Sequence, residues 1–395
     1  MIAALAALVP VAVWAYLIAA RGGFWLCRER DDAAFARLRE PPLTTAGAPD
    51  VIAVMPARDE AAVIAASVTS LLRQDYPGRL SLVIVDDESA DGTAAAARAA
   101  AAAVGQADRV QVVTGSATPG GWTGKLWAMR QGLAALEAGG NSPEFVLFTD
   151  ADIAYAPQTL RRLVAIARSR DAALASLMAK LRCVSLAERL LAPAFVFFFQ
   201  KLYPFAWVND SRSKTAAAAG GCMLVRRQAL AAAGGLETLR GALIDDCALA
   251  AAMKRQGPIW LGLTDDVTSL RAHPDVADFG AMIVRSAYAQ LRYSPLLLIG
   301  AVAGMVVTYL APPLLAVFAD GAERAAGLIA WALMALAFTP MLRFYRQPAA
   351  AGVALPVIAA VYTVFTIESA LQHWRGRGGH WKGRYQASTS GMDSA

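Results

Sequence analysis

The sequence predicts an α/β protein with a mostly parallel sheet, helices on both faces of the sheet, and apolar helices that hold it at a membrane. Three observations support this prediction. Strand-like and helix-like segments alternate from residue 50 to residue 150, a pattern typical of parallel sheets. Four uncharged apolar stretches each approach the roughly 20 residues that cross a bilayer as a helix. Acidic residues follow three predicted strands, at the edge where such sheets bind ligands.

The composition supports a membrane protein with a folded soluble part. Of the 395 residues, 57% are hydrophobic and 17% are charged, against about 45–50% and about 25% in an ordinary globular protein. This excludes a disordered chain. The four cysteines form no CxxC pair, which argues against a disulfide scaffold and a zinc site. Despite the net charge of +6, no basic run interleaved with aromatic residues indicates nucleic acid binding.

Residues 1–20 predict a transmembrane anchor. A cleaved signal peptide is the alternative, but no basic residue precedes the apolar run, and the run is longer than in most signal peptides. Arg21, Arg28 and Arg30 follow directly, and cytoplasmic flanks are rich in such residues. We therefore expect a bacterial inner-membrane protein whose central domain faces the cytosol.

The central block reads as alternating strands and helices. The predicted strands are DVIAVMPARDE, LSLVIVDD, RVQVVTG and EFVLFTD, and the predicted helices between them are AAVIAASVTSLLRQ, DGTAAAARAAAAAV and GKLWAMRQGLAAL. The strands are short apolar runs, as in sheets buried on both faces. Asp59 and Glu60 are natural N-terminal residues for the first helix.

Carboxylates gather at the ends of these strands. Asp86 and Asp87 close the second strand, and Asp150 and Asp152 close the fourth. A single such residue is often a helix cap, but capping explains three acidic strand ends poorly. Side chains two apart on an extended segment point the same way, so Asp150 and Asp152 can converge on Mg²⁺ or Mn²⁺ together with phosphate oxygens. The pattern predicts a site for a metal and a nucleotide diphosphate.

Other motif-based functions are excluded. GGWTGKLW lacks both the first glycine of a phosphate loop and the Ser or Thr after its lysine. The sequence contains no GxGxxG after the first strand, no HExxH and no GxSxG. A dinucleotide enzyme, a metalloprotease and a serine hydrolase are therefore disfavoured.

The ordered motifs MPARDE, VDDESADGT, GKLWAMRQG, TDAD, GGCMLVRR and LIDDCAL resemble the family 2 inverting glycosyltransferases with a GT-A fold. This resemblance spans roughly residues 50–293. Finer segments, including GGWTGK, AAAAGGCMLV, GALIDDCALA and SAYAQLRYSPLLL, resemble the bacterial hopene-associated glycosyltransferases of hopanoid gene clusters, relatives of ceramide glucosyltransferase. The resemblance implies a membrane enzyme that glycosylates a lipid.

The resemblance implies roles for individual residues. The residues expected to bind the nucleotide sugar are Asp59, Glu60, Asp87, Lys125 and Asp150. Asp150 and Asp152 form the DxD pair, with Asp152 as the direct metal ligand. Asp246 is the expected catalytic base with Asp245 beside it. Capping of the helix CALAAAMKRQ is the alternative role for this pair.

On the acceptor side the resemblance is looser. Gln290, Arg292 and Tyr293 stand where relatives carry a QxxRW-type motif, but the spacing here is QLRY. This departure disfavours a processive polymerase, and the three residues can equally be anchors of an interfacial helix. Residues 188–208 are aromatic and interrupted by prolines. They predict an interfacial helix in the head-group region, with a buried core helix as the alternative.

The C-terminal topology stays open. Three crossings after a cytosolic domain would place the tail outside, yet Arg375, Arg377, Lys382 and Arg384 favour the cytosol. One stretch can be re-entrant, with Pro312-Pro313 or Pro356 as the break.

Together these observations predict four regions: an anchor at 1–20, a GT-A domain at 48–293, transmembrane helices at 295–371 and a basic tail at 372–395. The expected activity is transfer of one sugar, UDP-linked, to a lipid hydroxyl with inversion, and the resemblance implies a hopanoid or a related polyisoprenoid lipid as the acceptor. The alternatives are a processive polysaccharide synthase and a non-catalytic nucleotide-binding membrane protein. The sequence does not determine the sugar, because pocket contacts decide it, and it does not determine the acceptor or the oligomeric state.

Overall fold

The computed structural model describes residues 2–38, 43–44, 47–140, 142–381 and 384–385. The remainder of the predicted basic tail, residues 382–383 and 386–395, lies outside the described residues. The chain forms two compact units. The sheet unit comprises Glu29–Arg182 and Trp207–Ala272, and the helical unit comprises Met1–Arg28, Cys183–Ala206 and His273–Ala395.

The sheet unit is built on one eight-stranded sheet with the order β3-β2-β1-β4-β7-β6-β8-β5. Its strands are β1 (Val51–Ala57), β2 (Leu80–Asp86), β3 (Val110–Thr114), β4 (Phe145–Thr149), β5 (Ile153–Tyr155), β6 (Leu174–Lys180), β7 (Cys222–Arg226) and β8 (Ile259–Ser269). Strands β1 to β4 are parallel to one another, and β6 is parallel to β8. β7 runs antiparallel to both of its neighbours, and β5 runs antiparallel to β8. The predicted mostly parallel sheet is confirmed, and the antiparallel strands β5 and β7 are an addition that the sequence did not predict.

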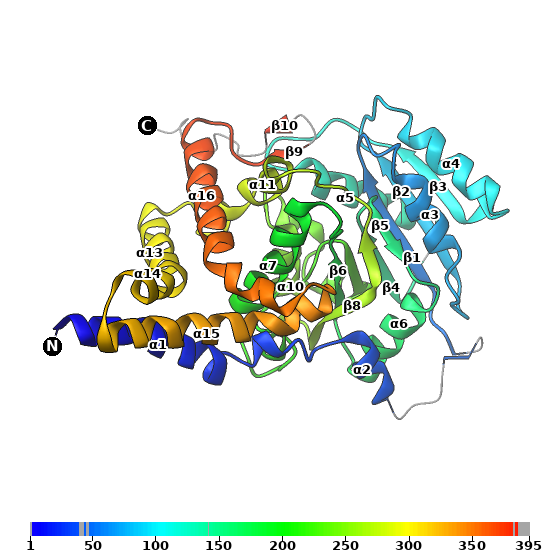
Figure 1. The fold of residues 1–395 in the computed structure, drawn as a ribbon. Helices are drawn as coiled ribbons and strands as arrows, with labels where there is room; N and C mark the ends of the chain where they lie inside the picture. The colour runs from blue at the N-terminus through cyan, green and yellow to red at the C-terminus, as the bar shows by residue number, and fades with distance from the viewer. Residues whose placement is uncertain (1, 39–42, 45–46, 141, 382–383, 386–395) are drawn as a thin grey trace. The chain divides into compact units, whose positions relative to one another are not determined.

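Helices cover both faces of this sheet (Figure 1). Residues of α3 (Ile64–Leu72), α4 (Thr93–Ala103) and α6 (Thr159–Ser169) form one apolar core with the β1 side chains Val51, Ala53 and Met55. The opposite face of β1 carries Val54, which meets α5 (Gly124–Ala138) at Gly132. Alternate residues of a strand point to opposite faces, so the fully buried pattern of β1 requires helices on both sides.

One detail of the first helix differs from the sequence prediction. Asp59 and Glu60 are not its N-terminal residues, because α3 begins at Ile64 with Val63 as its N-cap. Asp59 instead has a left-handed φ of 50°. Its carboxylate Oδ1 accepts a hydrogen bond from the Ala90 backbone N–H, 2.9 Å away. This tertiary contact draws the acidic residues away from the helix and into the loop after β1.

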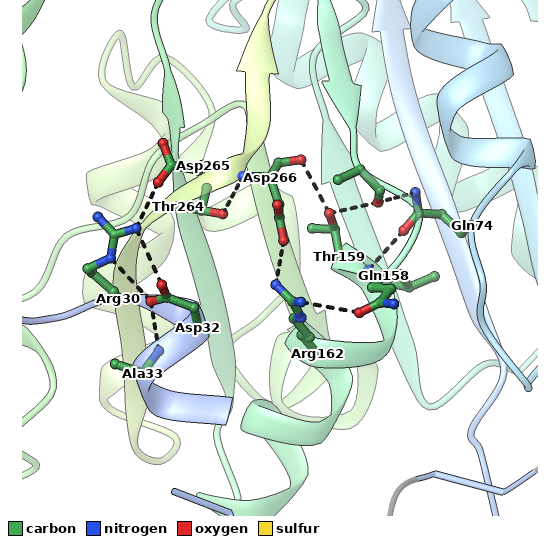
Figure 2. A network of polar contacts seen from close by, with 12 residues as sticks. Arg30, Asp32, Ala33, Gln74, Gln158, Thr159, Arg162, Thr264, Asp265 and Asp266 are labelled. Atoms are coloured by element: carbon green, nitrogen blue, oxygen red, sulfur yellow. Dashed lines mark hydrogen bonds and ion pairs between the residues drawn. The ribbon is translucent and has the colours of Figure 1, made fainter. Parts of the chain in front are cut away.

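The segment that follows the N-terminal apolar stretch is fastened to β8 within the sheet unit (Figure 2). Arg30, directly before α2 (Asp31–Ala36), pairs with Asp265 of β8 at 2.8 Å. On the next residue of β8, Asp266 pairs with Arg162 of α6 at 2.6 Å. Two adjacent residues of β8 are therefore held by ion pairs, one to the segment before α2 and the other to α6.

The rest of the sheet unit consists of short helices. They are η2 (Ala107–Arg109), α8 (Phe205–Val208, which begins at the boundary between units), α9 (Arg227–Ala232), η3 (Leu236–Leu239) and α10 (Asp245–Lys254).

The helical unit contains the apolar stretches. Its elements are α1 (Ile2–Ala20), η1 (Phe24–Leu26), α7 (Leu186–Leu202), α11 (Val276–Val284), α12 (Ala287–Gln290), α13 (Pro295–Met305), the π-helical turn η4 (Val306–Leu310), α14 (Ala311–Phe318), α15 (Gly321–Phe344), η5 (Ala349–Ala354), α16 (Leu355–Trp374), and the short strands β9 (His380–Trp381) and β10 (Arg384–Tyr385).

Three of these helical segments have the length and apolar composition needed to cross a membrane: Pro295–Phe318, Gly321–Phe344 and Ala349–Trp374. Ala6–Ala20 is a shorter apolar helix. Large apolar side chains of these helices are exposed, and Leu296 and Phe318 of the segment Pro295–Phe318 are each 79% exposed. Exposed apolar surface of this kind is typical of a membrane or protein interface, so the helical unit is suited to association with a membrane.

A side chain of α1 repairs the break made by prolines in the first of these segments. Pro312 has no N–H, so it cannot donate to the carbonyl of Thr308 four residues earlier. The indole N–H of Trp14 donates to that oxygen instead, at 2.8 Å. Trp14 is fully buried and packs edge-on against Tyr309. Satisfying the orphaned carbonyl lets the helix continue through the proline pair.

Helix α7 lies in the interior of the helical unit. Ten of its residues are buried, among them Phe197, Phe198 and Gln200. Phe197 packs on Phe338 of α15, and Phe198 packs on Tyr362 of α16. This burial is what a core helix shows, and a place in the lipid head-group region remains a prediction.

The packing of α5 on β1 can be tested at Gly132. A Cβ added there would lie 2.5 Å from Val54 Cγ1, and overpacking of this kind costs about 1–3 kcal/mol, whereas the helix propensity of alanine returns only about 1 kcal/mol. We expect Gly132→Ala to lower the thermal unfolding midpoint of the detergent-solubilised protein. Gly120→Ala is the matched control, because a Cβ at Gly120 meets nothing within 4 Å. Equal midpoints for the two variants would contradict the close packing.

Candidate active site

The end of β4 and the start of β7 bring three segments of the sheet unit together. β4 and β7 are antiparallel with Thr149 opposite Cys222, so Asp150 lies next to the two glycines that precede β7. Helix α10 begins with Asp245 and Asp246, and the Asp246 carboxylate reaches the Gly220 backbone. The register of one strand pair thus gathers acidic residues that are almost 100 positions apart in the sequence.

Lys125, in the first turn of α5, joins these acidic residues. Its Nζ lies 2.9 Å from Asp150 Oδ1 and 3.2 Å from Asp245 Oδ2. Burial acts to lower the pKa of Lys125, but the combined charges of Asp150 and Asp245 outweigh it and hold the pKa above its usual value. Lys125 therefore remains a cation at neutral pH. It links Asp150 of the predicted DxD motif to Asp245, the neighbour of the predicted catalytic base Asp246.

Asp246 is held by two backbone N–H groups. The Gly220 N–H donates to Oδ2 at 3.0 Å, and the Cys247 N–H donates to Oδ1 at 2.7 Å. Burial raises the pKa of Asp246 to about 6, the negative charge of Asp245 acts in the same direction, and Lys125 opposes it. A carboxylate with this pKa is mostly ionised at neutral pH and still accepts a proton readily, which suits a general base.

Gly220 leaves room for this arrangement. A Cβ on Gly220 would lie 3.2 Å from Lys125 Nζ and 3.4 Å from Asp246 Oδ2. The first of these contacts is tighter than side chains normally tolerate. The glycine thus allows the lysine and the aspartate to approach the backbone from the same side.

Asp152 is paired with a different basic side chain, that of Arg271. Its Oδ2 accepts a hydrogen bond from Arg271 Nε at 2.8 Å, and Arg271 Nη2 lies 2.5 Å from Glu60 Oε1. The Leu270 N–H donates to the Asp152 carbonyl oxygen at 2.7 Å, which fixes the backbone where β5 meets β8. Asp150 lies in no regular element and Asp152 lies in a turn. The carboxylates of this predicted pair are bound by Lys125 and Arg271, respectively.

The loops after β1 and β2 are bonded to each other. The Asp87 N–H donates to the Ala57 carbonyl oxygen at 2.8 Å, and Arg58 Nη1 donates to the Asp87 carbonyl oxygen at 2.7 Å. The Glu60 N–H donates to Thr93 Oγ1 at 2.8 Å. Asp87 is fully buried, and Asp59 contacts the same loop through Ala90. The predicted nucleoside-binding residues Asp59, Glu60 and Asp87 therefore lie in two loops that are hydrogen-bonded to each other.

Gln290, Arg292 and Tyr293 belong to the helical unit. Gln290 Nε2 donates to the Tyr203 hydroxyl at 2.6 Å. The ring of Tyr293 stacks on His373 with centroids 4.4 Å apart. Arg292 and Tyr293 both have left-handed φ values, 52° and 54°. These contacts organise the turn between α12 and α13 and do not connect it to the residues above.

The carboxylate oxygens of Asp150 and Asp152 are the hard ligands that Mg²⁺ or Mn²⁺ prefers. Among the described residues, no group of three or more His, Cys, Asp or Glu side chains could hold a metal ion. Sites completed by substrate phosphates commonly use only one or two carboxylates. The residues present fit a metal that arrives with a diphosphate.

Two contributors to the site were not foreseen from the sequence, Arg271 and Gly220. Arg271 lies two residues after the end of β8 (Ile259–Ser269), so a basic residue near a strand end was the available signal. Nothing in the sequence connects either residue to its carboxylate partner, because both contacts depend on tertiary pairing.

The sequence model described as "Glycosyltransferase like family 2" matches residues 49–261. No curated protein matches the chain. Among solved structures, a mannosyltransferase from Pyrobaculum calidifontis in complex with GDP-Man and Mn²⁺ is 20% identical, with 93% of this chain and 98% of that chain covered and a TM-score of 0.49.

Two further solved structures match with lower TM-scores. Glucosyl-3-phosphoglycerate synthase from Mycobacterium tuberculosis, in complex with Mg²⁺ and UDP, is 22% identical, with 62% and 81% of the two chains covered and a TM-score of 0.38. Mannosyl-3-phosphoglycerate synthase from Rubrobacter xylanophilus is 17% identical, with 67% and 84% covered and a TM-score of 0.39.

The role of Lys125 as the shared counter-charge can be tested by Lys125→Met. Removing one partner of a buried ion pair leaves uncompensated charge, and here the effect is up to about 3 kcal/mol because the groups are partly exposed. We expect a lower unfolding midpoint at pH 7.5. The deficit should shrink at pH 5, because Asp246, whose pKa is already raised to about 6, is then protonated and repels its neighbours less.

The second substitution Asp245→Asn in the Lys125→Met background supplies the control. It removes one of the carboxylates left without a cation, so it should recover part of the lost stability. A deficit that is independent of pH and is not recovered by Asp245→Asn would rule out the electrostatic role.

Proposed function

Because the chain belongs to glycosyltransferase-like family 2, we propose that it transfers one sugar from a nucleotide-sugar donor to the hydroxyl group of a membrane lipid, with inversion at the anomeric carbon. Its activity as a glycosyltransferase follows from the family. The donor, the acceptor and the residue roles below are the proposal.

The single observation that carries the mechanism is the environment of Asp246. Inverting transfer needs a base that takes the proton of the acceptor hydroxyl while that oxygen attacks the sugar from the face opposite the leaving group. Asp246 has a pKa raised to about 6, and two backbone N–H groups fix its orientation. Asp245 is ion-paired with Lys125, and Asp246 is the one of the two with the raised pKa, so we assign the base to Asp246.

On the donor side, Asp59, Glu60 and Asp87 would contact the nucleoside, and Asp150 and Lys125 would lie near its ribose and phosphates. Asp152, with Asp150, would hold Mg²⁺ or Mn²⁺. When bound, the ion would neutralise charge that develops on the diphosphate leaving group. Lys125 can move between Asp150 and a phosphate oxygen without losing its charge.

The acceptor proposal rests on the helical unit. Three helices long and apolar enough to cross a membrane would keep the enzyme beside a substrate dissolved in lipid. We propose a bacterial inner-membrane location with the sheet unit facing the cytosol, residues 1–20 as an anchor, and Gln290, Arg292 and Tyr293 on the acceptor side. The resemblance to hopene-associated enzymes favours a hopanoid or a related polyisoprenoid alcohol.

Asp246→Asn tests the base. An amide cannot accept the proton, and loss of a general base lowers rates by roughly 10²–10⁴-fold. In the wild type we expect kcat/KM, which reports the ionisation of the free enzyme, to rise with pH up to about 6, the pKa of Asp246, and then to level off, because only the deprotonated form is active. Donor binding, measured by calorimetry with a nucleotide diphosphate, should be nearly unchanged in the variant.

Asp75→Asn is the matched control, since Asp75 pairs with Arg161 on the surface and should keep wild-type kinetics. Unchanged turnover in Asp246→Asn, or a flat pH profile between pH 5 and pH 8, would sink the assignment.

The acceptor can be identified by mass spectrometry. Membranes that contain the full chain, incubated with a panel of nucleotide sugars, should form one lipid species heavier by a single sugar. Asp152→Asn membranes provide the background, because loss of the metal ligand should abolish the product. Long sugar chains, or products made only on water-soluble acceptors, would contradict the proposal.

A further inference from the structure

Arg271 lies among the proposed donor-binding carboxylates, and the proposed function assigns it no role. Its position is set by the sheet. Ile153 of β5 is opposite Ser269 of β8, and the Leu270 N–H donates to the Asp152 carbonyl oxygen at 2.7 Å. Arg271 is therefore the first residue of the chain beyond the β5–β8 ladder on the side of Asp152.

The guanidinium of Arg271 bridges two carboxylates from distant segments. Nε is 2.8 Å from Asp152 Oδ2, and Nη2 is 2.5 Å from Glu60 Oε1. The side chains of Asp152 and Glu60 are only 13% and 12% exposed, whereas that of Arg271 is 39% exposed. The arginine is thus the outermost of the three and lies partly open to solvent over the carboxylates.

The charges of this group favour the joint arrival of a metal and a diphosphate. One guanidinium against two carboxylates leaves a single negative charge. A divalent ion added at Asp152 would turn this into a single positive charge and would place two cations side by side. A diphosphate brings the negative charge that removes this repulsion. A metal ion that binds alone therefore competes with Arg271 for Asp152. A metal ion that binds together with a diphosphate does not, because the diphosphate compensates the added positive charge.

From this geometry we propose that Arg271 is a resident cation that holds Asp152 and Glu60 in the donor-free enzyme, and that on donor binding it leaves Asp152 and binds the diphosphate. This inference rests on the proposed function, because it takes Asp152 as a metal ligand. It adds a donor-binding residue and a reason for ordered assembly of the site.

The chemistry of the side chain suits both positions. Arginine remains charged at any physiological pH, and its planar fork matches carboxylate and phosphate oxygens equally well. Its long, partly exposed side chain can turn outward without rebuilding the strand, since the β8 backbone is fixed by its ladder and by the ion pairs of Asp265 and Asp266 (Figure 2). A lysine at this position would keep the positive charge but would lack the two parallel N–H donors of the guanidinium group.

The proposal is tested by binding of Mn²⁺ alone to the purified full chain, followed by electron paramagnetic resonance. If Arg271 occupies Asp152 for about 90% of the time, it weakens metal binding about tenfold. We expect Arg271→Gln to bind Mn²⁺ alone roughly tenfold more tightly than the wild type. In the presence of Mn²⁺, the same variant should bind UDP roughly tenfold more weakly, because a charge-assisted contact is lost. Arg271→Lys should show smaller changes in the same two directions.

Arg162→Gln is the matched control. It removes an arginine from an ion pair with Asp266 on the same strand, and it should leave both affinities unchanged. Thermal unfolding of each variant establishes that it is folded.

Unchanged or weaker binding of Mn²⁺ alone in Arg271→Gln and Arg271→Lys would overturn the proposal. This outcome is distinct from failure of the proposed function. If the proposed function were wrong, the wild type itself would bind no UDP with Mn²⁺ and would form no glycosylated lipid.

Discussion

Mutual repulsion among the carboxylates at one edge of the sheet is the constraint on which the site depends. Asp150, Asp245 and Asp246 lie close together, and two basic side chains make such crowding tolerable. Lys125 holds Asp150 and Asp245, and Arg271 holds Asp152 and Glu60. Because burying a charge without a partner is strongly unfavourable, Lys125 and Arg271 stabilise the carboxylates that they bind.

The two cations differ in what they can do. Lys125 is surrounded by acidic groups, and its presence limits how far the pKa of Asp246 rises. Arg271 lies farther out and is partly exposed. In the proposed mechanism, Lys125 therefore tunes the base Asp246, and Arg271 covers the carboxylates proposed to bind the metal.

In the helical unit the constraint is the pairing of backbone carbonyl oxygens. Its apolar helices contain prolines that would leave buried carbonyl oxygens unpaired, and Trp14 satisfies one of them at Thr308. Trp14 packs on Tyr309, and Tyr309 packs on Phe198 of α7, which in turn packs on Tyr362 of α16. A polar group left unpaired in lipid is expensive, so this contact supports the continuity of the segment Pro295–Phe318.

The sequence by itself determined the classes of element and the chemistry. Alternating apolar runs predicted strands β1 to β4 and the helices between them, because burial on both faces imposes a local pattern that a single sequence carries. Uncharged stretches predicted the apolar helices for the same reason, and strand-end carboxylates predicted an acidic edge. The tertiary structure alone decided which charges neutralise which, since the antiparallel insertion of β7 and the β5–β8 pairing bring Gly220 and Arg271 to carboxylates from distant segments. It also moved Asp59 and Glu60 out of α3, because a loop contact to Ala90 outweighs a local preference for a helix start. Contacts between residues far apart in the chain leave no local pattern, and for that physical reason only the folded chain shows them.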